Sequence, residues 1–322
     1  MLKKLTVLNL KGCENLKNLP RKFEMGSLKI LILSDCSKIK TIPEFGENMR
    51  ILTELHLDGT AITKLPTSIE NLSGLASLNV KDCKNLMSLS STFFNMTWLK
   101  DLNLCGCKKL LENLGIGESV EVNGQMASSN AFETLKKIAF GGFQLLPCYP
   151  MWRSSEPIGL LLSSLFGFSS LTILNLSNCN LKEIPNDIGC LFSLEYLDLS
   201  ENNFGCLPKS IAKLSVLNVL RVDNCMNLQS LPKLPLNIGY IDGFGCSSLE
   251  TLQDLLKPNS SFQPIFALSN CSKLSDNQGF IDLFFAVIKK SPQVSLSLSL
   301  SLSIDRSIDS KHLALYVSGT LS

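Results

Sequence analysis

Cysteine and histidine are the residues of this chain that could most readily bind a metal or catalyse a reaction. The 322 residues contain 12 cysteines and two histidines, His56 and His312. Cys105-Gly106-Cys107 is a close cysteine pair, but no second cysteine or histidine pair stands at the spacing of a zinc site. His56 lies two residues before Asp58, and such a pair can transfer protons. Without a nucleophile beside it, it is more simply a solvated surface pair, so we expect no metal site and no catalytic residues.

The chain also lacks the short motifs that mark common enzymes. It contains no G-x-x-x-x-G-K-[ST] phosphate loop, no G-x-G-x-x-G after a strand, no H-E-x-x-H and no G-x-S-x-G. We therefore expect a protein that is not an enzyme and has no cofactor. The net charge of +2 argues against a nucleic-acid binder, and the absence of an 18-residue apolar run argues against a membrane span.

The elements that would position the polar side chains follow from an internal repeat. Residues 171–193, LTILNLSNCNLKEIPNDIGCLFS, align without a gap with the segment that follows them, residues 194–216, LEYLDLSENNFGCLPKSIAKLSV. The first part of each unit, L-x-x-L-x-L-x-x-[CN]-x-[LF], is the leucine-rich-repeat pattern. Leu174-x-Leu176 and Leu197-x-Leu199 place two leucines on one face of a short strand.

One such strand cannot bury its leucines alone, whereas stacked strands from successive units form a parallel sheet with a continuous apolar core. The predicted fold is an α/β solenoid. It is a leucine-rich-repeat horseshoe with a concave parallel β-sheet and an irregular or short-helical convex side. The Pro-x-x-Ile segments, as in Pro185 to Ile188, return the chain over the outside.

The template recurs in nine clear units, which begin at Leu5, Leu28, Leu52, Leu75, Leu99, Leu171, Leu194, Leu217 and Ile238. The stretch from Leu99 to Leu171 is long enough for further units, and Val120-x-Val122 and Ile138-x-Phe140 resemble weakened strands. We expect repeats over residues 1–143, the last two of them degenerate, and again over residues 171–256.

The remaining segments differ in composition from the repeats. Residues 144–170 are rich in proline and serine and are predicted to form an inserted loop. Residues 257–290 form a post-repeat segment in which IDLFFAVIKK, residues 281–290, predicts a short helix that caps the last repeat. Residues 291–322 include the strict alternation SLSLSLSLS and are predicted to be a low-complexity tail.

Seven of the cysteines occupy one position of the repeat, just after the strand, where Thr60 and Asn202 stand in other units. These seven are Cys13, Cys36, Cys83, Cys107, Cys179, Cys225 and Cys246. A position shared by Cys, Thr and Asn indicates a small buried site where a side chain contacts the turning backbone. We expect reduced core thiols rather than disulfides.

The residues between the repeat leucines form the exposed face of the sheet and are the candidate binding residues. In the C-terminal units this face carries aromatic and charged side chains that favour a protein interface. The candidates are Tyr196, Asp198, Glu201, Arg221, Asp223, Tyr240 and Asp242. The simpler interpretation of any one of them is a solvated residue of a sheet face.

Several stretches resemble the leucine-rich-repeat region of plant intracellular nucleotide-binding immune receptors of the class that carries a TIR domain. LTVLNLKGCENLKNLP, LKILILSDCSKIKTIP and LTELHLDGTAITKLPTSIENLSGL carry the likeness, and IFALSNCSKLSDNQGF, residues 265–280, resembles the segment that follows the repeats in that class. The resemblance implies a region that detects a pathogen effector or a guarded host protein. It also implies a contact, in cis or in trans, with a nucleotide-binding module that is held inactive.

The resemblance places that module, with its ADP or ATP site, outside this chain, which starts within the repeats and looks like a fragment or a truncated relative. The N-terminal sequence MLKKLTVLNL enters the first repeat directly and is not typical of a signal peptide. We therefore expect a cytoplasmic protein, with the nucleus as a further compartment. A free-standing leucine-rich-repeat scaffold or adaptor remains the alternative function.

Overall fold

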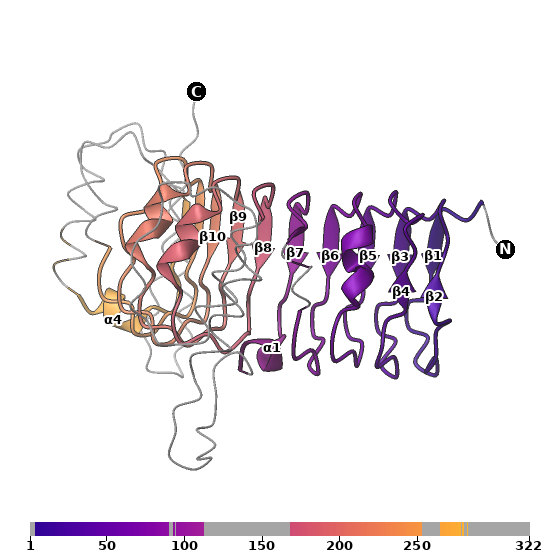
Figure 1. Cartoon of the computed structure of the whole chain (residues 1–322). Helices are drawn as coiled ribbons and strands as arrows, with labels where there is room; N and C mark the ends of the chain where they lie inside the picture. The colour runs from indigo at the N-terminus through magenta and orange to yellow at the C-terminus, as the bar shows by residue number, and fades with distance from the viewer. Residues whose placement is uncertain are drawn as a thin grey trace, which may run out of the picture.

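The computed structural model describes residues 4–89, 93, 95–112, 168–252 and 265–277, together with Gly279 and Asp282. Ten short parallel strands lie side by side in one sheet, and Figure 1 shows the row running from β1 near the N-terminus towards β10. The strands are β1 (Val7–Asn9), β3 (Ile30–Ile32), β5 (Glu54–His56), β6 (Ser77–Asn79), β7 (Asp101–Asn103), β8 (Ile173–Asn175), β9 (Tyr196–Asp198), β10 (Val219–Arg221), β11 (Tyr240–Asp242) and β12 (Ile265–Ala267). The predicted parallel solenoid is confirmed.

Each strand is three residues long, and its middle residue points into the core. Leu55, Leu78, Leu102, Leu174 and Leu197 are all fully buried middle residues. Parallel pairing in constant register aligns them, as in Leu174 with Leu197 and Leu197 with Leu220. Burial of one such leucine stabilises the fold by about 1.5–3 kcal/mol, so the stacked row of leucines is the main source of the sheet's stability.

The chain returns from one strand to the next through short helices and irregular segments. Three five-residue 3-10 helices, η1 (Thr67–Asn71), η4 (Asn186–Cys190) and η5 (Lys209–Lys213), each follow a proline in extended conformation. Each buries an isoleucine, Ile69, Ile188 or Ile211. The core therefore lies between the sheet and these returning segments, as the Pro-x-x-Ile pattern predicts.

A second, two-stranded sheet forms in the first two returning segments. Strands β2 (Lys22–Phe23) and β4 (Glu44–Phe45) pair in parallel, and the rings of Phe23 and Phe45 stack with centroids 6.2 Å apart. The backbone N–H of Phe45 donates to Ser68 Oγ at 2.7 Å, which joins η1 to this small sheet. No sequence pattern predicted β2 and β4.

The sheet passes directly from β7 to β8, although a long stretch of the chain, residues 104–172, separates the two strands. Asp101 pairs with Ile173, and the Cys179 thiol donates to the Leu104 carbonyl oxygen at 3.2 Å. Because the ladder hydrogen bonds of β7 and β8 are made to each other, no third strand lies between them in the sheet. This pairing corrects the expectation that weakened repeats continue the sheet there. The residues expected to form them, 113–143, lie outside the described part.

The boundary of the predicted inserted loop also moves. Phe168 is fully buried and packs edge-on against Phe93 at a centroid distance of 5.4 Å. The backbone N–H of Leu171 donates to the carbonyl oxygen of Phe168, just as the N–H of Leu194 donates to the carbonyl oxygen of Leu191 in the next unit. Phe168 therefore already belongs to the repeat. It occupies the buried position three residues before Leu171, which Leu191 occupies before Leu194. Residues 144–167 of the predicted loop lie outside the described part.

The C-terminal end of the described solenoid contains one strand more than predicted. In the post-repeat segment, β12 pairs with β11, and Phe266 is buried as the middle residue. The described helices α1 (Lys108–Glu112) and α4 (Ser272–Ser275) are each about one turn long. The expected capping helix, apart from Asp282, and the expected tail lie outside the described residues.

The third residue after each strand of the large sheet has a positive φ, between 54° and 73°, and Asn180 in the turn after β8 has one as well. The third residue must tolerate the left-handed conformation, which Gly, Asn and Asp do most readily. The row consists of Gly12, Asp35, Gly59, Asp82, Gly106, Asn178, Glu201, Asn224, Gly245 and Asn270. Glu201, with φ 57°, is the one residue of this row that is neither Gly, Asn nor Asp.

Candidate protein-binding face

The third residue of most strands is an Asn or Asp that caps the turn following it. Its side-chain oxygen accepts a hydrogen bond from the backbone N–H two residues later, an arrangement that Asn and Asp favour. The six acceptors are Asn9, Asn79, Asn103, Asn175, Asp198 and Asp242, at distances of 2.9 to 3.3 Å. Part of the reason for Asp at positions 198 and 242 is therefore structural.

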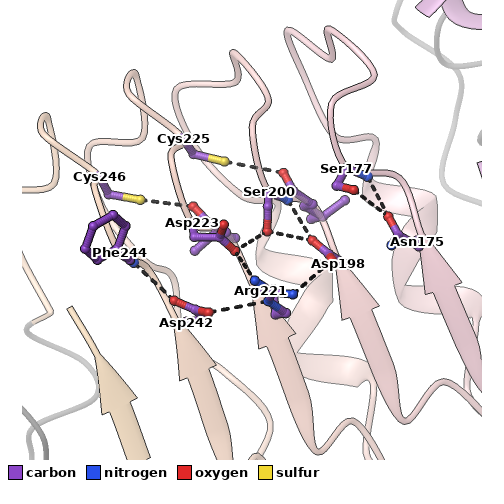
Figure 2. A network of polar contacts seen from close by, with 12 residues as sticks. Asn175, Ser177, Asp198, Ser200, Arg221, Asp223, Cys225, Asp242, Phe244 and Cys246 are labelled. Atoms are coloured by element: carbon purple, nitrogen blue, oxygen red, sulfur yellow. Dashed lines mark hydrogen bonds and ion pairs between the residues drawn. The ribbon is translucent and has the colours of Figure 1, made fainter. Parts of the chain in front are cut away.

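Arg221 stands in this same row, between Asp198 and Asp242 on the neighbouring strands. Its guanidinium contacts three carboxylates: Nη2 lies 3.0 Å from Asp223 Oδ1, Nε lies 3.4 Å from Asp242 Oδ2, and Nη1 lies 3.7 Å from Asp198 Oδ2. Figure 2 shows the guanidinium among these carboxylates: Asp198 and Asp242 belong to β9 and β11, and Asp223 follows β10. One cation thus orients acidic side chains of three successive repeats.

Ser200 connects two of the carboxylates. Its hydroxyl lies 2.6 Å from Asp198 Oδ1 and also contacts Asp223 Oδ1. Ser200 and Asp198 are almost fully buried, so this part of the network is shielded from water. Because one hydroxyl carries one proton, it can donate to only one carboxylate at a time, and the cluster keeps a negative character.

The electrostatics of the cluster keep Arg221 charged. Partial burial acts to lower the pKa of Arg221, but a hydrogen bond with Tyr196 and the carboxylates of Asp223 and Asp198 outweigh it and raise the pKa. The Arg221 side chain is 36% exposed, so solvent still reaches one side of the guanidinium. The cluster therefore presents one permanent cation held by three acidic residues.

Apolar and aromatic side chains occupy the first position of the same strands. Register places Ile173, Tyr196, Val219 and Tyr240 next to one another across four strands. Ile173 is exposed and the other three are half-buried. We call the outward side chains of β8 to β11, with the residue two after each strand, the C-terminal face: Ile173, Asn175, Ser177, Tyr196, Asp198, Ser200, Val219, Arg221, Asp223, Tyr240, Asp242 and Phe244.

Six of the seven predicted binding residues lie on this face. Register and ion pairs bring Tyr196, Asp198, Arg221, Asp223 and Asp242 together, and Tyr240 stands beside Val219 at its edge. Glu201 is not part of the cluster, because it occupies the left-handed turn position and its side chain is exposed. Ser200 was missed, although the D-x-S spacing from Asp198 could have indicated a side chain on the same face.

The cysteine position of the repeat is a buried slot from Cys36 onward, as predicted, but Cys13 in the first repeat is exposed, which corrects the expectation of a core thiol there. We call the slot the ten aligned residues Cys13, Cys36, Thr60, Cys83, Cys107, Cys179, Asn202, Cys225, Cys246 and Cys271. From Cys36 onward, each cysteine thiol donates to a backbone carbonyl of the preceding repeat at 3.0 to 3.3 Å. Cys271, at the end of the described sheet, is an additional member that the sequence pattern did not reveal.

Burial makes these thiols poor acids. It raises the pKa of Cys83 and Cys271 to about 11 and that of Cys179 and Cys225 to about 12. All the cysteines of the described residues are free thiols. Because a thiolate is needed for nucleophilic attack and metal binding, the slot is structural rather than reactive.

Elsewhere, the described residues offer little that could perform chemistry. His56 does not pair with Asp58: its Nε2 lies 3.3 Å from Glu54 Oε2. The Asp58 carboxylate instead accepts hydrogen bonds from the side chains of Ser34 and Asn79. Over the described ranges, no three His, Cys, Asp or Glu side chains are grouped so that they could hold a metal ion. The helices of the same ranges are too short or too polar to cross a bilayer.

Comparison with known proteins gives two overlapping family matches. The family described as "Disease resistance protein RPS4B-like, leucine-rich repeats" matches residues 23–186, which is about half of the chain. A second family, described as a leucine-rich repeat region, matches residues 125–275. Together they include nearly all of the described strands.

Curated relatives with sequence similarity are plant disease resistance proteins. Disease resistance-like protein DSC1 of Arabidopsis thaliana is 36% identical over 301 residues, with 84% of this chain and 24% of that protein covered. TMV resistance protein N of Nicotiana glutinosa is 33% identical over 251 residues, which cover 73% of this chain and 21% of that protein. Disease resistance protein RPS4B of Arabidopsis thaliana is 32% identical over 271 residues, which cover 83% of this chain and 18% of that protein.

The chain thus spans about a quarter or less of the length of these relatives. The match lies in the repeats, where the cysteine slot, the strand leucines and the left-handed turn residues recur in every unit. This chain belongs to the RPS4B-like leucine-rich-repeat family of disease resistance proteins.

Proposed function

We propose that this chain is a non-catalytic protein-recognition module of a plant immune receptor and that the C-terminal face is its binding surface. The observation that supports the proposal most directly is the concentration of two tyrosines, one arginine and two aspartates on three adjacent strands, with a third aspartate just after the middle one. Tyr and Arg contribute most often to binding energy in protein interfaces, because they bury a large area and carry a polar end.

The rigidity of the surrounding framework supports the same proposal. Leu197, Leu220 and Ile241 are fully buried directly beneath the candidate residues. Ion pairs and the Ser200 hydrogen bonds hold the charged side chains in one arrangement. A preorganised face loses less conformational entropy on binding than a flexible one, so more of the contact energy contributes to affinity.

Family membership supports the biological setting of the proposal. In it, the face detects a pathogen effector or a guarded host protein and also contributes to the contact of the repeats with the nucleotide-binding module of a receptor, in cis or in trans. The protein would act in the cytoplasm, with the nucleus as a further compartment. The free thiols of the slot are consistent with a reducing compartment.

Co-precipitation tests this proposal. The chain is expressed in plant leaf tissue together with the separated nucleotide-binding portion of a related resistance protein. We expect retention of that portion, and loss of it when the repeat surface is altered by Tyr196→Ala with Tyr240→Ala. The control variant Val7→Ala changes an exposed residue at the same strand position of β1, far from the C-terminal face. Failure of the folded, unaltered chain to retain its partner would instead favour the free-standing scaffold.

A further inference from the structure

The C-terminal face differs in charge from the equivalent face of the N-terminal strands. The positions compared are the two outward residues of each strand, the residue before the strand, and the second and third residues after it. On β8 to β11, these positions carry five carboxylates, Glu195, Asp198, Glu201, Asp223 and Asp242, and the single cation of Arg221, a formal charge of −4. The same positions on β1 to β7 carry five carboxylates and four lysines, a formal charge of −1.

Glu195 and Glu201 give this charge an accessible component. Both side chains are exposed, whereas Asp198, Asp223 and Asp242 are at most 16% exposed and are engaged with Arg221. The buried carboxylates hold the guanidinium in place, and the two exposed ones are available to a partner. A cationic side chain would therefore approach a surface on which negative charge exceeds positive charge.

The apolar side chains lie along one side of this acidic region. Ile173, Tyr196, Val219 and Tyr240 form a row at the start of the strands, and Asp198, Arg221 and Asp242 form a row two residues later, about 7 Å away from the strand rise. The turns that precede β9, β10 and β11 also carry exposed apolar residues, Phe192, Val216 and Leu236, the last of them 78% exposed. Aromatic rings next to carboxylates also suit a cation, because the ring face attracts positive charge.

We propose that the C-terminal face binds a partner segment in which lysine or arginine side chains stand beside large apolar side chains. The segment crosses β8 to β11, with its apolar side chains on the row that contains Tyr196 and Tyr240 and its cations towards Glu195, Glu201 and the aspartates. Four strands at about 4.8 Å spacing span roughly 14 Å, the length of about ten helical residues. This inference rests on the proposed binding role of the face and specifies the chemistry of its partner.

A peptide selection tests the proposal. The full chain is used to select binders from a phage-displayed library of random 12-residue peptides, and each enriched peptide is then measured against two test variants and their controls. Tyr196→Ser with Tyr240→Ser alters the apolar row, and Val7→Ser is its control on β1. Glu195→Gln with Glu201→Gln removes two exposed charges without touching the Arg221 network, and Glu54→Gln is the control for a partly exposed glutamate on β5.

The expected peptides are enriched in Lys or Arg together with apolar residues and lose binding to the tyrosine variant. Removing the two glutamates weakens their binding by roughly 3- to 10-fold at low salt, and the difference disappears at about 0.5 M salt, where the charges are screened. Neither control variant changes the affinity by more than about twofold.

Two other outcomes would overturn the proposal and can be told apart. Acidic or neutral peptides that still depend on Tyr196 and Tyr240 would contradict the basic partner and leave the face as a binding surface. An acidic peptide docking on Arg221 would also bind more tightly, not less, to the Glu195→Gln, Glu201→Gln variant. Peptides whose binding is unaffected by the tyrosine variant would contradict both this inference and the proposed function.

Discussion

Arg221 Nη2 lies 3.0 Å from Asp223 Oδ1, two residues further along the same chain segment, and the same guanidinium contacts Asp198 and Asp242 on the strands to either side. This relationship connects three repeats through a single side chain. It also determines what the face can present: a held guanidinium beside half-buried Tyr196 and Tyr240 and exposed Ile173 and Phe244, with exposed Glu195 and Glu201 next to the face.

Removal of this cation should destabilise the fold moderately. Arg221→Ala leaves three partly or fully buried carboxylates close together without a counter-charge, and we expect the free energy of unfolding to fall by about 1–2 kcal/mol. The 36% exposure of Arg221 keeps the loss well below that of a fully buried ion pair. Urea unfolding of this variant and of Arg50→Ala, an exposed arginine outside the cluster, measures the effect. Equal losses in the two variants would show that the cluster contributes nothing specific.

The stacked leucines should dominate stability. Leu197→Ala leaves a cavity beneath the face and should cost on the order of 2–5 kcal/mol. Val216→Ala, which changes a 43% exposed side chain in the turn before β10, should cost less than about 0.5 kcal/mol. Thermal and urea unfolding of both variants checks this, and a loss below about 1 kcal/mol for Leu197→Ala would contradict the assigned core.

Asn202 should be the residue of the slot that is hardest to replace. It is 1% exposed, its amide group donates to the carbonyls of Leu176, Leu199 and Ser200, and its oxygen accepts from the N–H groups of Cys179 and Leu181, all at 2.8 to 3.2 Å. Asn202→Ala leaves these buried groups unsatisfied and should cost about 3 kcal/mol or more. Asn202→Cys, the usual residue of the slot, should recover part of that loss in the same unfolding assay; no recovery would mean that the repeats are not equivalent there.

The raised thiol pKa values predict a loss of stability at alkaline pH. Below pH 9, the ordinary thiol value, folded and unfolded thiols are both protonated and the contribution of burial is complete. Between pH 9 and the folded values of about 11 for Cys83 and 12 for Cys225, only the unfolded thiols ionise, so the free energy of unfolding falls with rising pH. Each ionising thiol contributes about 1.4 kcal/mol per pH unit.

Cys225→Thr checks this contribution, because Thr60 already fills the same slot and donates to the Leu57 carbonyl at 2.7 Å. Unfolding measured at pH 8.5, 9.5 and 10.5 should show a shallower decline for the variant. An unchanged slope would mean that Cys225 does not titrate with unfolding.

Glu201 should be a source of local strain. A glutamate with φ 57° adopts a conformation that costs about 1 kcal/mol or more for a residue with an ordinary side chain. Glu201→Asn, which introduces the residue found at positions 178, 224 and 270 of the same row, should raise the free energy of unfolding by about 0.5–1 kcal/mol. Glu195→Asn, outside this row, is the control, and an equal gain there would remove the strain as the cause.

The sequence predicted the features that repeat and missed those that do not. Leu174-x-Leu176 and Leu197-x-Leu199 predicted the strands, and the shared position of Cys, Thr and Asn predicted the slot. The sequence could not predict the pairing of Asp101 with Ile173, because the contact joins segments that lie far apart in the chain and depends on no local pattern. β12 was missed because Ile265-Phe266-Ala267 lacks the paired leucines of the template.

The candidate face was predictable only in part. Alternation identified which residues of β9 to β11 point outward, and six of the seven named residues lie there. It could not indicate that Arg221 would bond to three carboxylates, since that depends on rotamers and on the strand register. It also placed Glu201 with the face, although the turn geometry separates that residue from the cluster.

The measurement that tests the account most directly is the affinity of a face-binding peptide, obtained from the selection above, for the unaltered full chain and three variants of it. Titration calorimetry with Tyr196→Ala and with Tyr240→Ala should show losses of about 1–2 kcal/mol each, while Val7→Ala binds as the unaltered chain does. Unfolding temperatures should agree among all four proteins, because none of the altered side chains fills the core. Affinities that stay the same in both tyrosine variants would contradict the assignment of the C-terminal face as the binding surface.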